Sequence, residues 1–280
     1  MKKILILGSE GQIGFHLKKF LKKKKYKILE FDLVRSIKDD LRKSENIRLI
    51  KLVKKSQFIF FLAFDVGGSR YLKKHQNTYK FISNNMKLMT NTFEVISRFK
   101  KKFIFASSQM SNMSFSNYGI LKNIGEKYSN ILNGIVVKFW NVYGIEKDLS
   151  KSHVITDLIL KGLKKNKIQI LTSGKEVRDF LYAEDCCAGL EIIMKKFNII
   201  KKFNKPVDLT TGKYTSILNI AKIIKKILYE KKLIVSIKTS KKIDTIQKNK
   251  KNLPDKFFFK FWKPKYNLEQ GIREIVNHYL

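Results

Sequence analysis

The chain has 280 residues, of which 44% are hydrophobic, and it carries a formal net charge of +36. It is long enough to bury a sizeable core, in one large domain or in a domain with a smaller lobe, but its longest apolar run, residues 58–64, is too short to cross a bilayer. The N-terminus lacks a signal-peptide pattern, the only cysteines are adjacent (Cys186 and Cys187) and the four histidines are scattered, so we expect a cytoplasmic protein without structural metal or membrane insertion.

The positive charge has two interpretations. Dense lysine could neutralise the phosphates of a nucleic acid. However, the lysines are spread along the whole chain and occupy the polar faces of expected helices, as at Lys18, Lys19 and Lys22, while arginine is scarce. We therefore favour a lysine-rich codon bias, with loose attraction to anions as a side effect, and expect no specific nucleic-acid partner.

Strand and helix patterns alternate through the first half of the chain. The predicted elements are strand 4–7, helix 13–21, strand 26–31, helix 49–53, strand 58–63, helix 84–99, strand 103–106, helix 118–132 and strand 135–140. Apolar strands without polar alternation are typical of a parallel sheet covered by helices on both faces. The pattern predicts an α/β fold, with a Rossmann-type doubly wound parallel sheet over residues 1–150.

The pattern loosens after Gly144, and we place a soft boundary near residue 150. The predicted elements there are helix 153–163, strand 168–171, helix 184–197, strand 207–209, helix 217–228, strand 233–237 and helix 268–278. We expect residues 151–280 to form a smaller C-terminal substrate-binding lobe, with residues 178–197 packing back on the first domain.

A glycine corner follows the first predicted strand. Gly8, Gly11 and Gly14 form G-x-x-G-x-x-G and open the first helix, where glycine lets the backbone approach a pyrophosphate and the helix N-terminus supplies amide hydrogens. Asp32 ends the second strand, where a carboxylate binds both ribose hydroxyls of NAD and repels the 2′-phosphate of NADP. The nearby Arg35 weakens that preference.

Further candidates for cofactor contact surround this corner. Gln12 and Ile13 lie within it, Ala63 ends the third apolar strand, and Asp40 and Leu41 follow an expected additional strand position from which they could reach an adenine ring. The alternatives are an ordinary strand–turn–helix corner and a solvated loop aspartate. The combination of strand, helix and Asp32 favours NAD binding.

A second constellation lies in the middle of the chain. Tyr118 and Lys122 form Y-x-x-x-K, which puts both side chains on one helix face. A lysine ammonium beside a tyrosine, together with an oxidised nicotinamide, can lower the tyrosine pKa toward neutrality. Ser107 and Ser108 end the preceding strand, and we choose Ser108 to hold the substrate oxygen. The Y-x-x-x-K spacing and the paired serines are each common by themselves. Their occurrence together with the glycine corner is what favours a catalytic site.

Several segments in order carry a family resemblance. They are GSEGQIG at 8–14, the helix from Asn85 to Asn91, FIFASS at 103–108, YGILK at 118–122, VVKFWNVYG at 136–144, RDFLYAEDC at 178–186 and WKPKYNLEQGI at 262–272. Nearly end to end, the chain resembles the extended short-chain dehydrogenases/reductases of the NAD-dependent epimerase/dehydratase family, which act on nucleotide sugars. The resemblance implies a nucleotide-diphosphate sugar substrate contacted by Arg178 and Asn141, and a homodimer paired through helices 84–99 and 118–132.

The segment SHVITDLI at 152–159 is similar to one in GDP-fucose synthases, in which the matching histidine is an acid/base for epimerisation. This resemblance makes His153 a candidate proton donor. The alternative is a histidine at a helix start with no chemical role.

Departures from the family pattern limit the reaction. Only nine residues separate Ser108 from Tyr118, and Met110, which cannot shuttle a proton, stands where the family's dehydratases carry an acid. The sequence therefore favours epimerisation or simple oxidation–reduction at one sugar carbon, C4, for a surface polysaccharide sugar. A 4,6-dehydratase-like enzyme and a non-catalytic NAD-binding sensor remain as alternatives.

Overall fold

A parallel sheet of six strands forms the centre of the protein. The structure, a computed structural model, describes residues 2–244 and 253–280. The strand order across the sheet is β10-β5-β4-β3-β1-β2, and each neighbouring pair is parallel. The strands are β1 (Lys3–Leu7), β2 (Lys27–Phe31), β3 (Phe58–Phe61), β4 (Phe103–Ser108), β5 (Ile135–Phe139) and β10 (Val207–Leu209).

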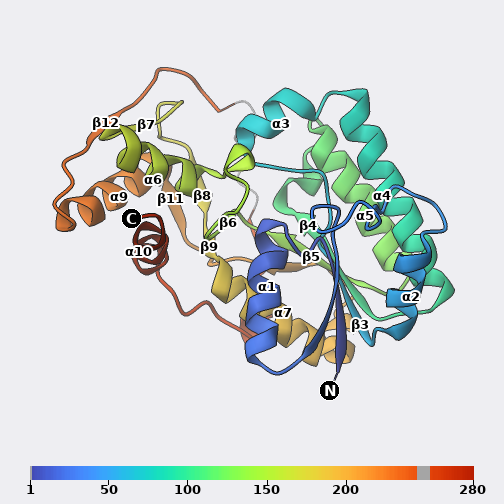
Figure 1. Cartoon of the computed structure of the whole chain (residues 1–280). Helices are drawn as coiled ribbons and strands as arrows, with labels where there is room; N and C mark the ends of the chain where they lie inside the picture. Colours follow the sequence, from blue (N-terminus) through green and yellow to red (C-terminus); the bar gives the residue numbers. More distant parts are fainter. Residues whose placement is uncertain (1, 245–252) are drawn as a thin grey trace.

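Successive residues of the central strands are buried on opposite faces of the sheet. In β1, Ile4 and Ile6 join one apolar core, while Leu5 and Leu7 join another, and all four are fully buried. Figure 1 shows α1 (Gln12–Lys23) and α7 (Ala183–Lys195) on one side of the sheet, and α2 (Ile47–Lys55), α4 (Tyr79–Arg98) and α5 (Asn117–Ile131) on the other. The predicted Rossmann-type doubly wound fold is confirmed.

The chain returns to this sheet after residue 150. Strand β10 pairs with β5, and helix α7 packs against α1, where its Leu190 shares a core with Leu17 and Leu21. Cys186 and Cys187 are buried in the same core as free thiols. The division into a domain of residues 1–150 and a lobe of residues 151–280 stays a prediction.

A third apolar core lies beside the sheet. It packs α6 (Val154–Lys165), α9 (Ile217–Glu230) and α10 (Leu268–Tyr279) together, with Ile155, Ile220 and Ile275 fully buried between them. These helices gather at the left of Figure 1 near the C-terminus. Strands β7 (Lys167–Gln169) and β12 (Ser236–Lys238) form a parallel pair beside these helices.

Two short strand pairings were not predicted from the sequence. The remaining elements are β6 (Val142–Tyr143) paired with β9 (Leu181–Tyr182), β8 (Val177–Asp179) paired with β11 (Tyr214–Ser216), helices α3 (Ser69–His75) and α8 (Phe197–Lys201), and the 3-10 helices Gln109–Asn112, Leu149–Lys151 and Lys256–Lys260. Strands of two or three residues contain too few side chains to show a period of two.

The additional strand expected before Asp40 is absent, because residues 32–46 form turns. Polar side chains bond the backbone there: Asp40 accepts the amide of Arg42 and pairs with its guanidinium, and Asn46 caps α2 by accepting from Leu49. Such local hydrogen bonds offer the backbone an alternative to a sheet ladder. Among the described residues, no helix is both long and apolar enough to cross a membrane.

Leu190→Ala tests whether α7 belongs to the sheet core. Because Leu190 is fully buried, the truncation should lower the free energy of unfolding by about 2–5 kcal/mol. Ile234→Ala, at a position that is 79% exposed, serves as the control and should change it by less than about 0.5 kcal/mol. Urea unfolding followed by circular dichroism measures both, and equal small effects would contradict the packing of α7.

Candidate functional site

One cavity of about 700 Å³ opens at the carboxyl end of the sheet. Its lining includes the glycine corner after β1, the ends of β3 and β4, the start of α5 and the segment that follows β5. Of the residues predicted from the sequence, it is lined by Gly8, Gly11, Gln12, Ile13, Gly14, Asp32, Asp40, Leu41, Ala63, Ser108, Tyr118, Lys122, Asn141 and His153. Ligands bind at this edge in open α/β sheets.

Two of the three glycines in the corner, Gly8 and Gly14, leave no room for a side chain. Gly8 has a φ of +86°, and a Cβ there would lie 2.7 Å from the backbone nitrogen of Ala63. A Cβ on Gly14 would lie 1.9 Å from the carbonyl oxygen of Gly8. Gly11 is the N-cap of helix α1 and has no side chain to cap it, so the first amide hydrogens of the helix are left for an anion, which fits a dinucleotide pyrophosphate.

The acidic end of β2 has a fixed geometry. The Asp32 carboxylate accepts hydrogen bonds from the amides of Glu10 (2.8 Å) and Val34 (2.9 Å) and lines the cavity. Arg35 is not among the lining residues, and its guanidinium pairs with Glu30 at 2.6 Å and with Glu10 at 3.4 Å. The Arg35 guanidinium, which could have bound the 2′-phosphate of NADP, is therefore paired with Glu30 and Glu10 instead. The Asp32 carboxylate lines the cavity, where it could accept hydrogen bonds from the ribose hydroxyls of NAD.

An ion-pair network connects the glycine corner with the segment after β6. Glu10 pairs with Lys18 and with Lys147, whose Nζ lies 2.6 Å from Oε2. Burial raises the pKa of Glu10, but hydrogen bonds from Lys147 and Lys18 outweigh it and hold this pKa at about 2. Lys147 thus joins the two walls of the cavity that it lines.

The two hydroxyl residues of the predicted catalytic set line the same cavity. Ser108 ends β4, and Tyr118 lies in the first turn of α5. Burial raises the pKa of Tyr118 to about 12, and the Ser108 hydroxyl opposes that rise. The neighbouring Ser107 donates instead to the carboxylate of Glu126, which supports the choice of Ser108.

Lys122 is buried beneath an aromatic ring. Its Nζ donates to the carbonyl oxygen of Ala106 at 2.6 Å and lies 3.6 Å from the ring centroid of Phe64. Burial lowers the pKa of Lys122 to about 7, against an opposing effect of Glu126. The Nζ is 5.8 Å from the ring centroid of Tyr118, and the protein alone does not produce the lowered Tyr118 pKa expected from the sequence.

Of the two residues predicted to contact the substrate, one lines the cavity and the other does not. Asn141 lines the cavity with a left-handed φ of 23°, and its side chain donates to the carbonyl oxygen of Asp179. Arg178 lies on β8 outside the lining and pairs with Asp244 at 2.6 Å. Besides Lys122, four further basic residues line the cavity and were not predicted as site residues: Arg42, Lys80, Lys147 and Lys151.

Among the other lining residues that sequence reasoning missed, two contact the predicted set. Phe64 follows the apolar strand 58–63, and Glu146 stands two positions after the Asn-Val-Tyr-Gly turn. The turn itself was a signal that could have drawn attention to Glu146. Nothing local marks Phe64, because its role depends on Lys122, 58 positions away along the chain.

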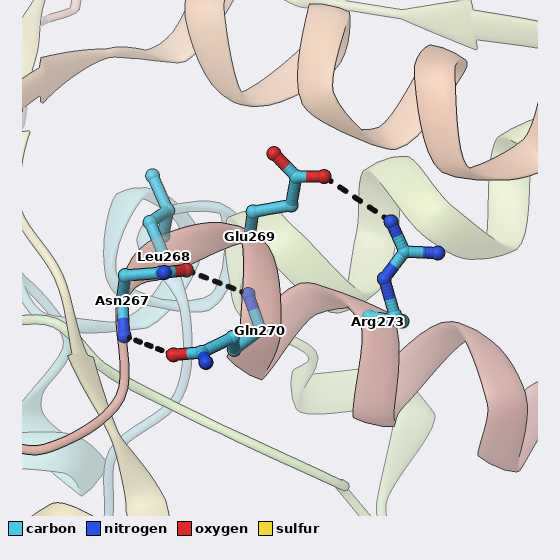
Figure 2. A pocket seen from close by; sticks show the side chains of 5 residues that line it. All are labelled: Asn267, Leu268, Glu269, Gln270 and Arg273. Atoms are coloured by element: carbon cyan, nitrogen blue, oxygen red, sulfur yellow. Dashed lines mark hydrogen bonds and ion pairs between the residues drawn. The ribbon is translucent and has the colours of Figure 1, made fainter.

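A second concavity, of about 420 Å³, lies at the start of α10. Figure 2 shows that its residues bond to one another: in a reciprocal capping box, the side-chain oxygens of Asn267 and Gln270 each accept the other's backbone amide, and Glu269 pairs with Arg273. These contacts stabilise the helix and leave no convergent set for chemistry. In the part of the chain that the structure describes, no cluster of three His, Cys, Asp or Glu side chains could hold a metal ion.

Comparisons with known proteins agree with this geometry. Residues 4–205 match the NAD dependent epimerase/dehydratase family. The GDP-L-fucose synthase of Sinorhizobium fredii is 26% identical over 97% of this chain and 93% of its own length. The UDP-glucose 4-epimerase of Thermotoga maritima, solved with UDP-glucose, superposes with a TM-score of 0.80 at 20% identity, covering 99% of this chain and 98% of that chain.

A further solved structure is the UDP-glucuronic acid 4-epimerase of Bacillus cereus, in complex with UDP-glucuronic acid and NAD. It has a TM-score of 0.81 at 20% identity and covers 99% of this chain and 100% of that chain. The structural likenesses show the fold, and the match over residues 4–205 confirms the family resemblance inferred from the motifs.

Lys122→Met tests the burial of the ammonium. Near pH 7 we expect the variant to be more stable than the natural protein by about 1–4 kcal/mol, because a buried charge is removed. Below about pH 7 the lysine is protonated in both states and the penalty is complete. Between pH 7 and 10.5 the lysine is deprotonated in the folded protein and protonated in the unfolded chain. The free energy of unfolding of the natural protein therefore rises with pH, and the difference in stability between Lys122→Met and the natural protein becomes smaller.

Thermal unfolding from pH 6 to 10 measures this difference. Lys164→Met, at an exposed helix position, is the control and should change stability little and without pH dependence. Parallel stability curves for Lys122→Met and the natural protein would rule out a charged, buried Lys122.

Proposed function

Because the chain belongs to the NAD dependent epimerase/dehydratase family, whose enzymes act on nucleotide sugars with NAD as cofactor, we propose that it is an epimerase or oxidoreductase transferring hydride at one sugar carbon, C4. One observation carries the proposal: a single cavity is lined by both the glycine corner with Asp32 and the set of Ser108, Tyr118 and Lys122. We further propose that the enzyme is cytoplasmic and makes a sugar for a surface polysaccharide.

The chain's own residues would manage the proton. When bound, NAD supplies the acceptor and donor of hydride. Tyr118 would take the proton of the sugar hydroxyl, Ser108 would orient that hydroxyl, and Lys122 would hold the cofactor ribose and tune Tyr118. Moving the Tyr118 pKa from about 12 to near 8 requires about 5 kcal/mol of added phenolate stabilisation, which the ligands and a charged Lys122 would have to provide.

The structure offers less support to the alternatives. Met110 is buried at 2% exposure and has no ionisable proton, so the position used by dehydratases of the family carries no acid. A non-catalytic NAD-binding protein has no use for Ser108, Tyr118 and Lys122 together in the lining of the cofactor cavity. Activity on a nucleotide sugar separates the proposed enzyme from such a sensor.

Substrate binding and assembly complete the proposal. Asn141 would contact the nucleotide sugar from inside the cavity, and Arg178 would reach the diphosphate only by exchanging its ion pair with Asp244. A homodimer would form through α4 and α5, which expose apolar side chains at Tyr79, Ile82 and Ile120. Light scattering after size-exclusion chromatography tests the dimer.

The first functional test mixes the purified protein and NAD with UDP-glucose, UDP-glucuronic acid and a GDP-linked sugar. We expect one of these to change its stereochemistry or oxidation state, as read by NMR and mass spectrometry. Tyr118→Phe should lower that rate by about 10²- to 10⁴-fold, because it removes the proton-carrying oxygen. Tyr229→Phe, 69% exposed on α9, should keep the natural rate. Retained activity in Tyr118→Phe would refute the mechanism.

Asp32→Asn tests the choice of cofactor. Loss of a charged acceptor for the ribose hydroxyls should weaken NAD binding by about 10- to 100-fold. It should also reduce the ratio of the NAD affinity to the NADP affinity. Isothermal titration calorimetry measures both affinities. Asp255→Asn, outside the cavity lining, is the control. Unchanged NAD affinity in Asp32→Asn would show that the ribose is held elsewhere.

A further inference from the structure

Glu126 is a buried carboxylate that the proposed hydride transfer does not use. It lies one helical turn after Lys122 on α5, and its side chain is 9% exposed. One oxygen, Oε1, accepts a hydrogen bond from the hydroxyl of Ser107, and the other, Oε2, lies 3.5 Å from Nζ of Lys138 on β5. Lys122 lines the cavity, whereas Glu126 and Lys138 do not. The carboxylate is therefore placed to act on Lys122 and not directly on a ligand.

Strand β4 holds these two charged side chains of α5 at neighbouring positions. Nζ of Lys122 donates to the carbonyl oxygen of Ala106 at 2.6 Å, and the next residue of the strand, Ser107, donates to Glu126. Both charged residues are buried. In the described part of the chain they form no direct ion pair, so each stays bonded to the strand and acts on the other only through its charge.

A purely structural role for Glu126 does not explain its charge. The Ser107 hydroxyl needs only an acceptor, which the amide oxygen of a glutamine would supply at a lower cost of burial. Lys138 compensates the carboxylate incompletely, because its Nζ is 3.5 Å away and also donates to Asn112 at 3.2 Å. A buried negative charge with so loose a partner leaves an attractive field for a cation at Lys122.

The elements packed against α5 bring no other buried acid to Lys122. Strand β4 and the 3-10 helix Gln109–Asn112 carry no ionisable side chain, and β5 contributes only Lys138. In the segment after β3, the carboxylate of Asp65 accepts a hydrogen bond from Tyr71. Burial lowers the pKa of Lys122 to about 7, and Glu126 opposes that fall. The ionisable residues of α4 are all exposed, and the others of α5 are phenols or an exposed lysine: Tyr79, Lys80, Lys87, Glu94 and Arg98 on α4, and Tyr118, Lys127 and Tyr128 on α5.

We propose that Glu126 is a positioning residue that keeps the proton on Lys122, and that Lys138 limits this effect. The inference rests on the proposed function, in which the Lys122 ammonium stabilises the phenolate of Tyr118. Burial alone favours the neutral amine, whereas a nearby carboxylate favours the ammonium. Because Glu126 lies outside the cavity lining, it does so without competing with a cofactor or a substrate for Lys122.

The titration of Lys122 tests this role without any ligand. In protein labelled with ¹³C at the lysine ε-carbons, the Lys122 signal should titrate near pH 7, and its absence from Lys122→Met assigns it. Glu126→Gln keeps an acceptor for Ser107 but removes the charge, and it should lower the midpoint by about one pH unit. Lys138→Met removes the competing cation and should raise the midpoint.

The opposite directions separate electrostatics from packing. Both variants break the same contact between Glu126 and Lys138, so a structural role would move the midpoint in the same direction in both. Any pattern other than opposite movements in the folded variants would overturn the proposal. Glu191→Gln is the matched control, since it changes a buried carboxylate bonded to Tyr26 and Lys195, and should leave the midpoint unchanged. Melting temperatures exclude unfolding. If Glu126→Gln does not fold, a midpoint in Lys138→Met that stays or falls overturns the proposal.

The reaction rate gives a second readout that depends on pH. The substrate is whichever of UDP-glucose, UDP-glucuronic acid and the GDP-linked sugar the natural protein converts. At pH 8, Glu126→Gln should lower this rate about tenfold with an unchanged KM, because a smaller fraction of Lys122 is protonated. At pH 5.5 the loss should be much smaller, since Lys122 is then mostly protonated in both proteins. An equal loss at both pH values would indicate a structural role and overturn the proposal.

The two measurements distinguish failure of this inference from failure of the proposed function. If Lys122 titrates as expected but the natural protein converts none of the nucleotide sugars, the proposed function fails, while the control of Lys122 by Glu126 stands. If conversion occurs but the midpoint does not move in Glu126→Gln and Lys138→Met, this inference fails and the proposed function stands.

Discussion

Removal of Tyr118 and Lys122 from water is the constraint on which the site depends. Burial favours the neutral form of each, raising the pKa of the phenol to about 12 and lowering the pKa of the amine to about 7. The protein alone therefore holds a weak acid beside a poised base. Ligands that bring charge into the cavity act at low dielectric, where a given charge shifts these pKa values most.

The sheet makes this burial possible. Ser108 and the carbonyl of Ala106 belong to β4, whose residues are buried throughout, and Lys122 rises from the adjacent α5 into that wall. Phe64, in the segment that follows β3, covers the Nζ. A pair of central strands with helices packed against them resists local opening, so the side chains keep one arrangement without bound ligand.

Acidic groups, more than lysines, organise the remaining site. The chain has 23 acidic residues and 59 basic ones, so a lysine at a given position says little about function. A buried carboxylate is rarer, and the hydrogen bonds and ion pairs that it accepts fix the segment that it contacts. Glu10 joins the glycine corner to Lys147, Glu146 holds His153, and Asp179 accepts bonds from the loop at 210–212. Glu10 and Asp179 connect parts of the chain that are distant in sequence, whereas Glu146 bonds a residue only seven positions away, and Asp179 lies outside the cavity lining. A few anions therefore fix segments in and around the cavity of a strongly cationic protein.

The sequence by itself determined the features that depend on short spacings. The buried strands, the glycine corner with Asp32, and the one-turn separation of Tyr118 from Lys122 follow from periods of two and 3.6 residues and from the freedom of glycine at positive φ. Only the tertiary structure decided that Phe64 covers Lys122, that Arg178 lies outside the cavity, that residues 32–46 turn instead of pairing, and that Glu146 takes the ring of His153. These features depend on which side chains meet after folding and on how much water burial removes, and neither quantity can be read from local spacing.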